Sequence, residues 1–147
     1  MFPIFRVRSF PIPTWGAVAL VVGVLTALPG ARAAGFSWQG VADAVGQKLE
    51  AAISEYRNGD EKEAKRALTE AYFGVFEGRK FEAAMRKTLG QTHAFEVERK
   101  FGNLRRLIGK KPVGDLEAAV ADLMQRLRAD ATTLDEKGVP EEVYDAR

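Results

Sequence analysis

The sequence predicts an all-α protein, an up-down-up-down antiparallel four-helix bundle that follows a signal peptide. Apolar residues recur at spacings of three and four along four segments, which is the period of a helix that buries one face. No segment of useful length alternates apolar and polar residues as a half-buried strand does. Short connections containing Gly or Pro separate the segments and favour antiparallel neighbours. We expect the bundle at residues 34–138 and a loose tail at residues 139–147.

Residues 1–33 have the layout of a secretory signal peptide. Arg6 and Arg8 form the basic start, and an apolar run follows from Trp15 to Leu28. A helix-breaking Pro-Gly pair and small residues come next, and cleavage is expected after Ala33. The apolar run is shorter than the roughly 20 residues that a helix needs to span a bilayer. The expected location is therefore the periplasm; the alternative is a protein anchored in the inner membrane by residues 15–28.

Composition narrows the classes of function. The whole chain has 22 Lys and Arg, 20 Asp and Glu, and no Cys. Since three of the arginines belong to the signal peptide, 19 basic side chains face 20 acidic ones in the remainder, and we expect no nucleic-acid partner. The lack of Cys excludes disulfides, thiolate metal sites and a Cys nucleophile. A single His, without a phosphate-binding or nucleophile motif, predicts neither an enzyme nor a small-molecule substrate.

The first two helices are expected at about residues 38–56 and 61–89. Asn58 ends the first helix together with the Gly that follows it. Asp60 is the predicted N-cap of the second, with Glu63 three residues later as in a capping box. The apolar stripe of the first helix is Val41, Val45, Leu49, Ala52, Ile53 and Tyr56. The stripe of the second is Leu68, Ala71, Val75, Gly78, Glu82, Met85 and Leu89, widened by Tyr72 and Phe76.

The third and fourth helices are expected at about residues 92–108 and 115–136. Thr92 and Asp115 are the predicted N-caps. The run GKKP at residues 109–112 supplies the Gly, the cations and the Pro that are typical of a helix C-terminus. The third stripe is Val97, Phe101, Leu104 and Ile108. The fourth is Leu116, Ala119, Val120, Leu123, Leu127, Ala131 and Leu134.

Glu82 is the strongest candidate for a site, because it occupies the apolar line of the second helix. Burying an unpaired carboxylate is costly, so Glu82 requires a cationic side chain, a proton or a bound cation. Glu77 lies about 140° around an α-helix from Glu82, and Glu98 flanks the stripe of the third helix, from which it could face either of them. Two interpretations stay open: these carboxylates are cation ligands, or each is ion-paired, for example with Arg79 or Arg105.

His93 and Glu96 form a second candidate metal pair. Their i, i+3 spacing places both side chains on one helix face, and Glu and His at that spacing build metal sites in helical bundles. The alternative is that His93 is a solvated residue of the first helical turn. The same spacing arises often by chance in a Glu-rich chain.

The run ALTEAYFGVFEGRKFEAAMRKTLG, followed by AFEVERKFGNLRRLIGK, resembles a known family. It is similar to the extracytoplasmic helical region that precedes the membrane part of bacterial high-affinity iron permeases of the iron/lead transporter family. It is more distantly similar to imelysin-like periplasmic iron-uptake proteins. The matching residues are Tyr72, Phe76, Glu77, Gly78, Glu82, Glu98, Phe101, Leu104 and Arg105. The resemblance implies a periplasmic module that works with a membrane iron permease or a periplasmic iron-uptake protein, and iron as the expected cation.

Two functions are therefore expected in competition. In the first, the module binds iron or another divalent cation through Glu77, Glu82 and Glu98 and hands it to a permease, since carboxylates are hard oxygen ligands. In the second, no metal binds, the carboxylates are salt-bridged, and Phe73 with Phe81 forms a docking face for a membrane partner. Convergence of three ligand groups would favour the first function, and pairing of each Glu with Arg or Lys would favour the second. In both, Gly74 and Gly78 are predicted to permit a bend or a close helix approach.

Overall fold

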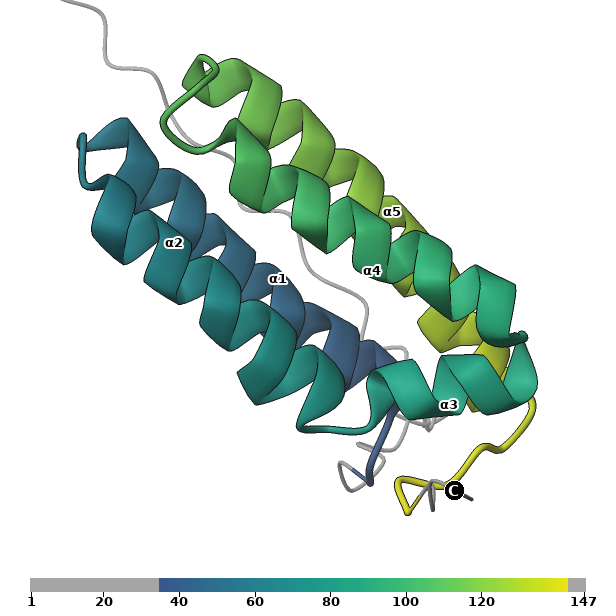
Figure 1. Cartoon of the computed structure of the whole chain (residues 1–147). Coiled ribbons are helices and arrows are strands. Elements are labelled where there is room, and N and C mark those ends of the chain that lie inside the picture. The colour runs from purple at the N-terminus through teal and green to yellow at the C-terminus, as the bar shows by residue number, and fades with distance from the viewer. Residues whose placement is uncertain (1–34, 143–147) are drawn as a thin grey trace, which may run out of the picture. The chain divides into compact units, whose positions relative to one another are not determined.

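The computed structural model describes residues 35–142, and all regular structure in that range is helical, which confirms the predicted all-α class (Figure 1). Five α-helices and one π-helical segment, η1, make up this range. In chain order the elements are α1 (Trp38–Arg57), α2 (Glu61–Thr69), η1 (Glu70–Glu77), α3 (Phe81–Thr88), α4 (Gln91–Leu107) and α5 (Val113–Glu136).

The long helices run side by side. Helix α1 packs against α2 and η1 on one side and against α5 on the other, and α4 packs against α5 (Figure 1). The short α3 runs at an angle to the others at one end and connects η1 to α4. This arrangement places η1 and α4 as neighbours on one face of the molecule.

The core consists of the apolar stripes that the periodicity predicted. Leu49 from α1, Leu104 from α4 and Leu127 from α5 are almost completely buried. The end of the core near α3 is aromatic: Trp38 stacks on Phe81 with ring centroids 5.6 Å apart. Burial of such large side chains stabilises the fold by about 1.5–3 kcal/mol each, so this part of the interior requires no metal or disulfide to hold it.

The predicted continuous helix at 61–89 is wrong. The chain passes from α-helix to π-helix at Glu70 and breaks at Gly78–Lys80, where Lys80 adopts a left-handed conformation with φ of 61°. A Cβ atom at Gly78 would lie 2.5 Å from the carbonyl oxygen of Gly74, so only Gly fits there. The expected bend therefore exists, but it is a complete break. As a result, Glu77 and Glu82 belong to different elements.

Helix starts differ from the sequence-based expectation in two of three cases. The Asp60 side chain accepts a hydrogen bond from the Glu63 amide at 2.9 Å, which confirms the cap of α2. Thr92 and Asp115 lie within the first turns of α4 and α5, so their predicted cap roles are wrong. Gly90, with φ of 107°, precedes α4, and Pro112 precedes α5. Both residues set the chain direction before the helix and replace a side-chain cap.

Two predictions concern segments that lie partly or wholly outside residues 35–142. The signal peptide at 1–33, including the apolar run, lies outside the described residues. Within residues 35–142, no helix is both long and apolar enough to cross a membrane. The tail was predicted to begin at 139, but Val139 packs against the core and its carbonyl accepts a hydrogen bond from the Trp38 indole at 2.8 Å. The anchored part of the chain therefore extends past residue 138.

Candidate functional site

Glu82 has the cationic partner that its position demands. Its side chain is 12% exposed and pairs with Arg86, one turn further along α3. The Arg86 guanidinium also lies 3.8 Å from Glu98 Oε1 on α4. The ion-pair interpretation named Arg79 or Arg105 as the cation, and the structure places Arg86 there instead. One arginine therefore serves both carboxylates and ties α3 to α4.

Glu77 reaches the same neighbourhood through Tyr72. The two residues are five positions apart, and a π-helix, with its i→i+5 hydrogen bonds, brings such residues onto one face. Burial raises the pKa of the Tyr72 hydroxyl above its usual range, and a hydrogen bond with Glu77 and the charge of Glu98 raise it further. Tyr72 thus stays protonated and joins Glu77 to the group around Arg86.

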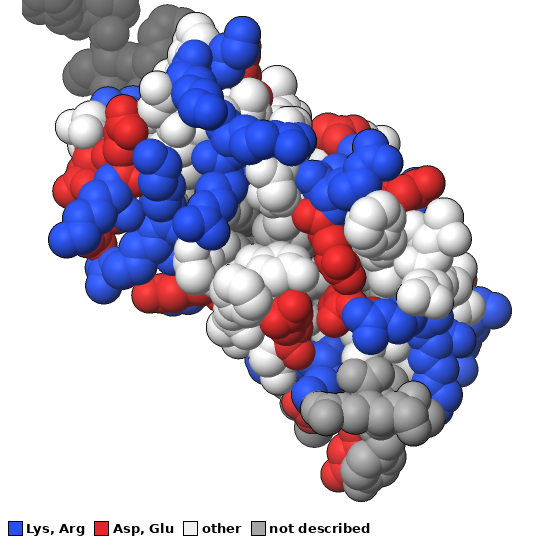
Figure 2. Space-filling model, viewed as in Figure 1, with Lys and Arg blue, Asp and Glu red and all other residues white. Residues whose placement is uncertain are grey.

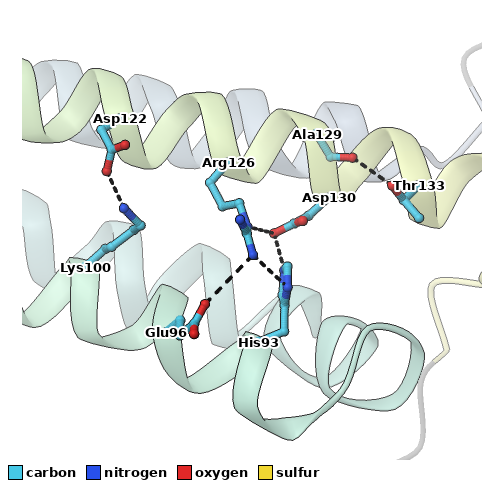
Figure 3. A network of polar contacts seen from close by, with 8 residues as sticks. All are labelled: His93, Glu96, Lys100, Asp122, Arg126, Ala129, Asp130 and Thr133. Carbon is cyan, nitrogen blue, oxygen red and sulfur yellow. Dashed lines mark hydrogen bonds and ion pairs between the residues drawn. The ribbon is translucent and has the colours of Figure 1, made fainter.

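The second predicted metal pair is part of a different network, between α4 and α5 (Figure 3). The guanidinium of Arg126 donates to Nδ1 of His93 at 2.8 Å, so the other ring nitrogen, Nε2, carries the proton and donates to Asp130 at 2.8 Å. Arg126 lies 4.0 Å from Glu96 and its Nε lies 3.6 Å from Asp130. Both nitrogens of His93 are occupied by these contacts and are directed at α5.

Asp130 is the residue that sequence reasoning missed. It is 5% exposed, the one buried charged side chain among residues 35–142. It follows Leu127 by three positions and precedes Leu134 by four, so it continues the apolar line of α5. This is the same signal that singled out Glu82, and it could have identified Asp130.

In the described part of the chain, these pairings leave no group of His, Asp and Glu side chains arranged as metal ligands. Within residues 35–142, no group of three or more His, Asp or Glu side chains has the geometry to hold a metal ion. The structure does bring Glu77, Glu82 and Glu98 into one neighbourhood, around Tyr72 and Arg86. It does not bring His93 and Glu96 together with them, since those two face α5.

An apolar surface groove of about 370 Å³ lies between α4 and the wall formed by η1 and the end of α2. Its floor is apolar, and two phenylalanines on its sides, Phe73 and Phe95, are each 57% exposed. Among the described residues the exposed large apolar side chains are Phe36 and these two. The groove is lined by Leu68, Thr69, Tyr72, Phe73, Phe95, Glu98, Arg99, Phe101, Gly102 and Arg105.

Of the predicted docking pair, Phe73 is exposed but Phe81 is not. Phe81 is completely buried and packs against Trp38 and Phe76. The break after Gly78 rotates α3 out of line with η1, so side chains that would share a face of one helix point in different directions. Phe95 takes the place beside Phe73. Sequence reasoning assigned no role to Phe95.

The charges around the groove are mostly basic. Figure 2 shows basic side chains gathered at the end of the molecule that carries the α1–α2 and α4–α5 connections, next to an area of uncharged side chains. Arg99 and Arg105 line the groove itself, and Glu98 is the acidic residue in its wall. Because Glu98 already lies against Arg86, the groove presents a net positive, partly apolar surface.

The wall that η1 contributes to the groove is π-helical. Such segments cost stability relative to an α-helix and are found frequently at functional sites. In comparisons with known proteins, no family model, no curated protein and no solved structure matched this chain. Its function is therefore argued from the groove and from the side-chain pairings.

Proposed function

We propose that this protein is a helical interaction module that docks a segment of a partner protein in the η1–α4 groove. The observation that carries the proposal is the exposure of Phe73 and Phe95 on the two sides of one apolar groove. Aromatic residues are enriched at the centres of protein interfaces and supply much of their binding energy. Burying each ring on docking would contribute about 1.5–3 kcal/mol.

The side-chain pairings support this function over a cation-binding one. Three conspicuous carboxylates, those of Glu82, Glu98 and Asp130, each lie against an arginine. Such pairs connect helices: Arg86 links α3 to α4, and Arg126 links α5 to α4. The carboxylates thus act as packing devices, which leaves the groove as the feature that the fold does not use.

In the proposed setting the chain is exported to the periplasm by residues 1–33, and its partner is a membrane protein. The resemblance to the extracytoplasmic region of iron permeases makes such a permease the first partner to test. The framework is then an antiparallel four-helix bundle with up-down-up-down order, in which α2 and η1 together form the second member and α3 is the connection to α4.

Photo-crosslinking tests the docking proposal. The full chain, carrying benzoylphenylalanine at position 73 or 95, is expressed in its own cells and irradiated. We expect one adduct of the same mass from both positions, and none from Gln125, an exposed control site on α5. Adducts at all three positions, or at none, would overturn the proposal.

A cation-handling role is a second proposal, favoured by the neighbourhood of Glu77, Glu82 and Glu98. Since Arg86 is the counter-ion of this group, a divalent or trivalent ion would have to displace it. Calorimetric titration of the full chain with Fe(II), Fe(III) and Mn(II) tests this role. Micromolar binding that a Glu82→Gln, Glu98→Gln variant loses would support it, and absence of heat from the folded protein would reject it.

A further inference from the structure

We infer that the docked segment is an acidic amphipathic helix, one of whose carboxylates lies over Gly102 between Arg99 and Arg105. The inference rests on the proposed docking function and adds the chemistry of the partner. Three features of α4 carry it: the spacing of the two arginines, the gap at Gly102, and the pairing state of the cations.

Arg99, Gly102 and Arg105 follow one another at intervals of three along α4, and all three line the groove. At a rise of about 1.5 Å per residue, the two arginines are separated by about 9 Å along the helix axis, with Gly102 midway. Long guanidinium side chains from both positions can therefore meet at a group placed over Gly102. A carboxylate there could accept charge-assisted hydrogen bonds from both sides.

Gly102 opens the space that such a group needs. A Cβ atom at this position would meet nothing within 4 Å, and the backbone there has ordinary helical geometry. No packing contact or turn in the described part of the chain requires Gly, although Gly in a helix interior costs roughly 0.5–1 kcal/mol relative to Ala. The missing side chain leaves the floor of the groove open between the arginines.

The groove arginines differ from other cations of the molecule in their pairing. Lys100 on the same helix pairs with Asp122, and Arg126 contacts His93 and Asp130. Within residues 35–142, neither Arg99 nor Arg105 has a carboxylate within ion-pair distance. Their charge is complementary to an acidic partner.

The apolar part of the groove suits a helix. It lies between two helical walls, and it is open to solvent on the side where Phe73 and Phe95 stand. An amphipathic helix enters such a groove through apolar side chains at i, i+3 or i+4, and i+7. A small ligand would instead need a concave site that covers most of its surface. Phe73, Tyr72 and Leu68 supply one wall for those apolar side chains.

The test uses three fluorescein-labelled, alanine-based helical peptides and the full chain. All three carry leucines at the i, i+4, i+7 and i+11 positions, and they differ only at the two positions that flank the i+7 leucine, which are Glu, Gln or Lys. Fluorescence anisotropy measures each dissociation constant. We expect the Glu peptide to bind roughly tenfold more tightly than the Gln peptide at about 50 mM salt, with the difference shrinking at about 500 mM.

Matched variants locate the effect. Arg99→Gln with Arg105→Gln should remove the preference for Glu over Gln. Arg106→Gln with Lys110→Gln removes the same charge from exposed positions outside the groove and should preserve the preference. Gly102→Leu, which fills the gap with a good helix former, should weaken the Glu peptide most.

Each alternative outcome has a definite meaning. Equal binding of the three peptides, abolished by Phe73→Ser with Phe95→Ser, would overturn the carboxylate inference and leave the docking function standing. Failure of every peptide to bind would overturn the inference, and the crosslinks at positions 73 and 95 would decide the docking function separately. Binding of phosphatidylglycerol vesicles in place of the Glu peptide, lost in the double Arg variant, would replace the peptide by a lipid as occupant.

Discussion

Within residues 35–142, helix α4 has paired polar side chains on the side that faces α5 and unpaired arginines on the side that faces η1. Toward α5, His93 and the acidic Asp130 are closed into a network with Arg126, and both ring nitrogens are used. Toward η1, Phe95 is exposed, and Arg99 and Arg105 have no ion-pair partner among the described residues. The first side pairs its charged groups within the fold, although Arg126 Nε is buried without a hydrogen-bond partner in the described part of the chain. The second side exposes apolar rings and unpaired charge, which is what a binding surface requires.

The sharpest contrast is between two phenylalanines that sequence reasoning put on one face. Phe81→Ala should lower the free energy of unfolding by about 3–5 kcal/mol, because it leaves a cavity beside Trp38. Phe73→Ala should change it by no more than about 0.5 kcal/mol, because the ring is already exposed. Urea denaturation followed by circular dichroism measures both. Equal losses would remove the distinction between core and groove.

The α4–α5 network can be broken at its buried carboxylate. Asp130→Ala should cost about 2–4 kcal/mol of stability, since it leaves the His93 Nε2–H without its acceptor and Arg126 without its nearest carboxylate. Asp122→Ala, on the same helix, removes an exposed pair with Lys100 and should change stability little. Thermal unfolding of the two variants separates them. If Asp130→Ala were neutral, the network would not be the closed structural unit described above.

Two glycines, one at the break after η1 and one in the groove, provide a further test. Gly78→Ala should destabilise by about 1–3 kcal/mol, because the new Cβ would overlap the Gly74 carbonyl oxygen. Gly102→Ala meets nothing within 4 Å and should stabilise by about 0.5–1 kcal/mol. Denaturant midpoints, compared at equal m-values, give the sign of the stability change for each variant. Destabilisation by Gly102→Ala would mean that Gly102 serves the fold and not the groove.

The smallest effect at neutral pH concerns Tyr72, beneath the groove. Its pKa is raised in the folded protein, so the fold holds the proton more tightly than the unfolded chain does. This contribution is fully present below about pH 10, the ordinary tyrosine value, and is lost as pH rises above it. Tyr72→Phe should therefore flatten the loss of stability above about pH 10. Parallel curves for wild type and variant would contradict the buried, Glu77-bonded hydroxyl.

Much of the fold follows from local pattern. Because helical periodicity of apolar residues is a property of neighbouring positions, most residues of the α1 and α5 stripes were predicted, although Met124 and Asp130 were not. Asp60 was predicted as a cap for the same reason, since the amide that it binds lies three residues away. A carboxylate on an apolar line predicted that Glu82 must have a partner, as burial forbids an unpaired charge.

Partners that lie in other elements were decided by tertiary structure. Arg86 follows Glu82 by one turn of α3, which is a local pair, but its contact with Glu98 and the position of Phe95 opposite Phe73 follow from the break at Gly78, which turns α3 away from η1. That break rests on a contact between backbone atoms, and no apolar period reports it. Apart from the break within residues 61–89, the sequence by itself determined most of the helical residues and the buried faces, since these depend on neighbours along the chain. The pairing of charges and the position of the groove depend on neighbours in space, which the packing of the helices alone sets.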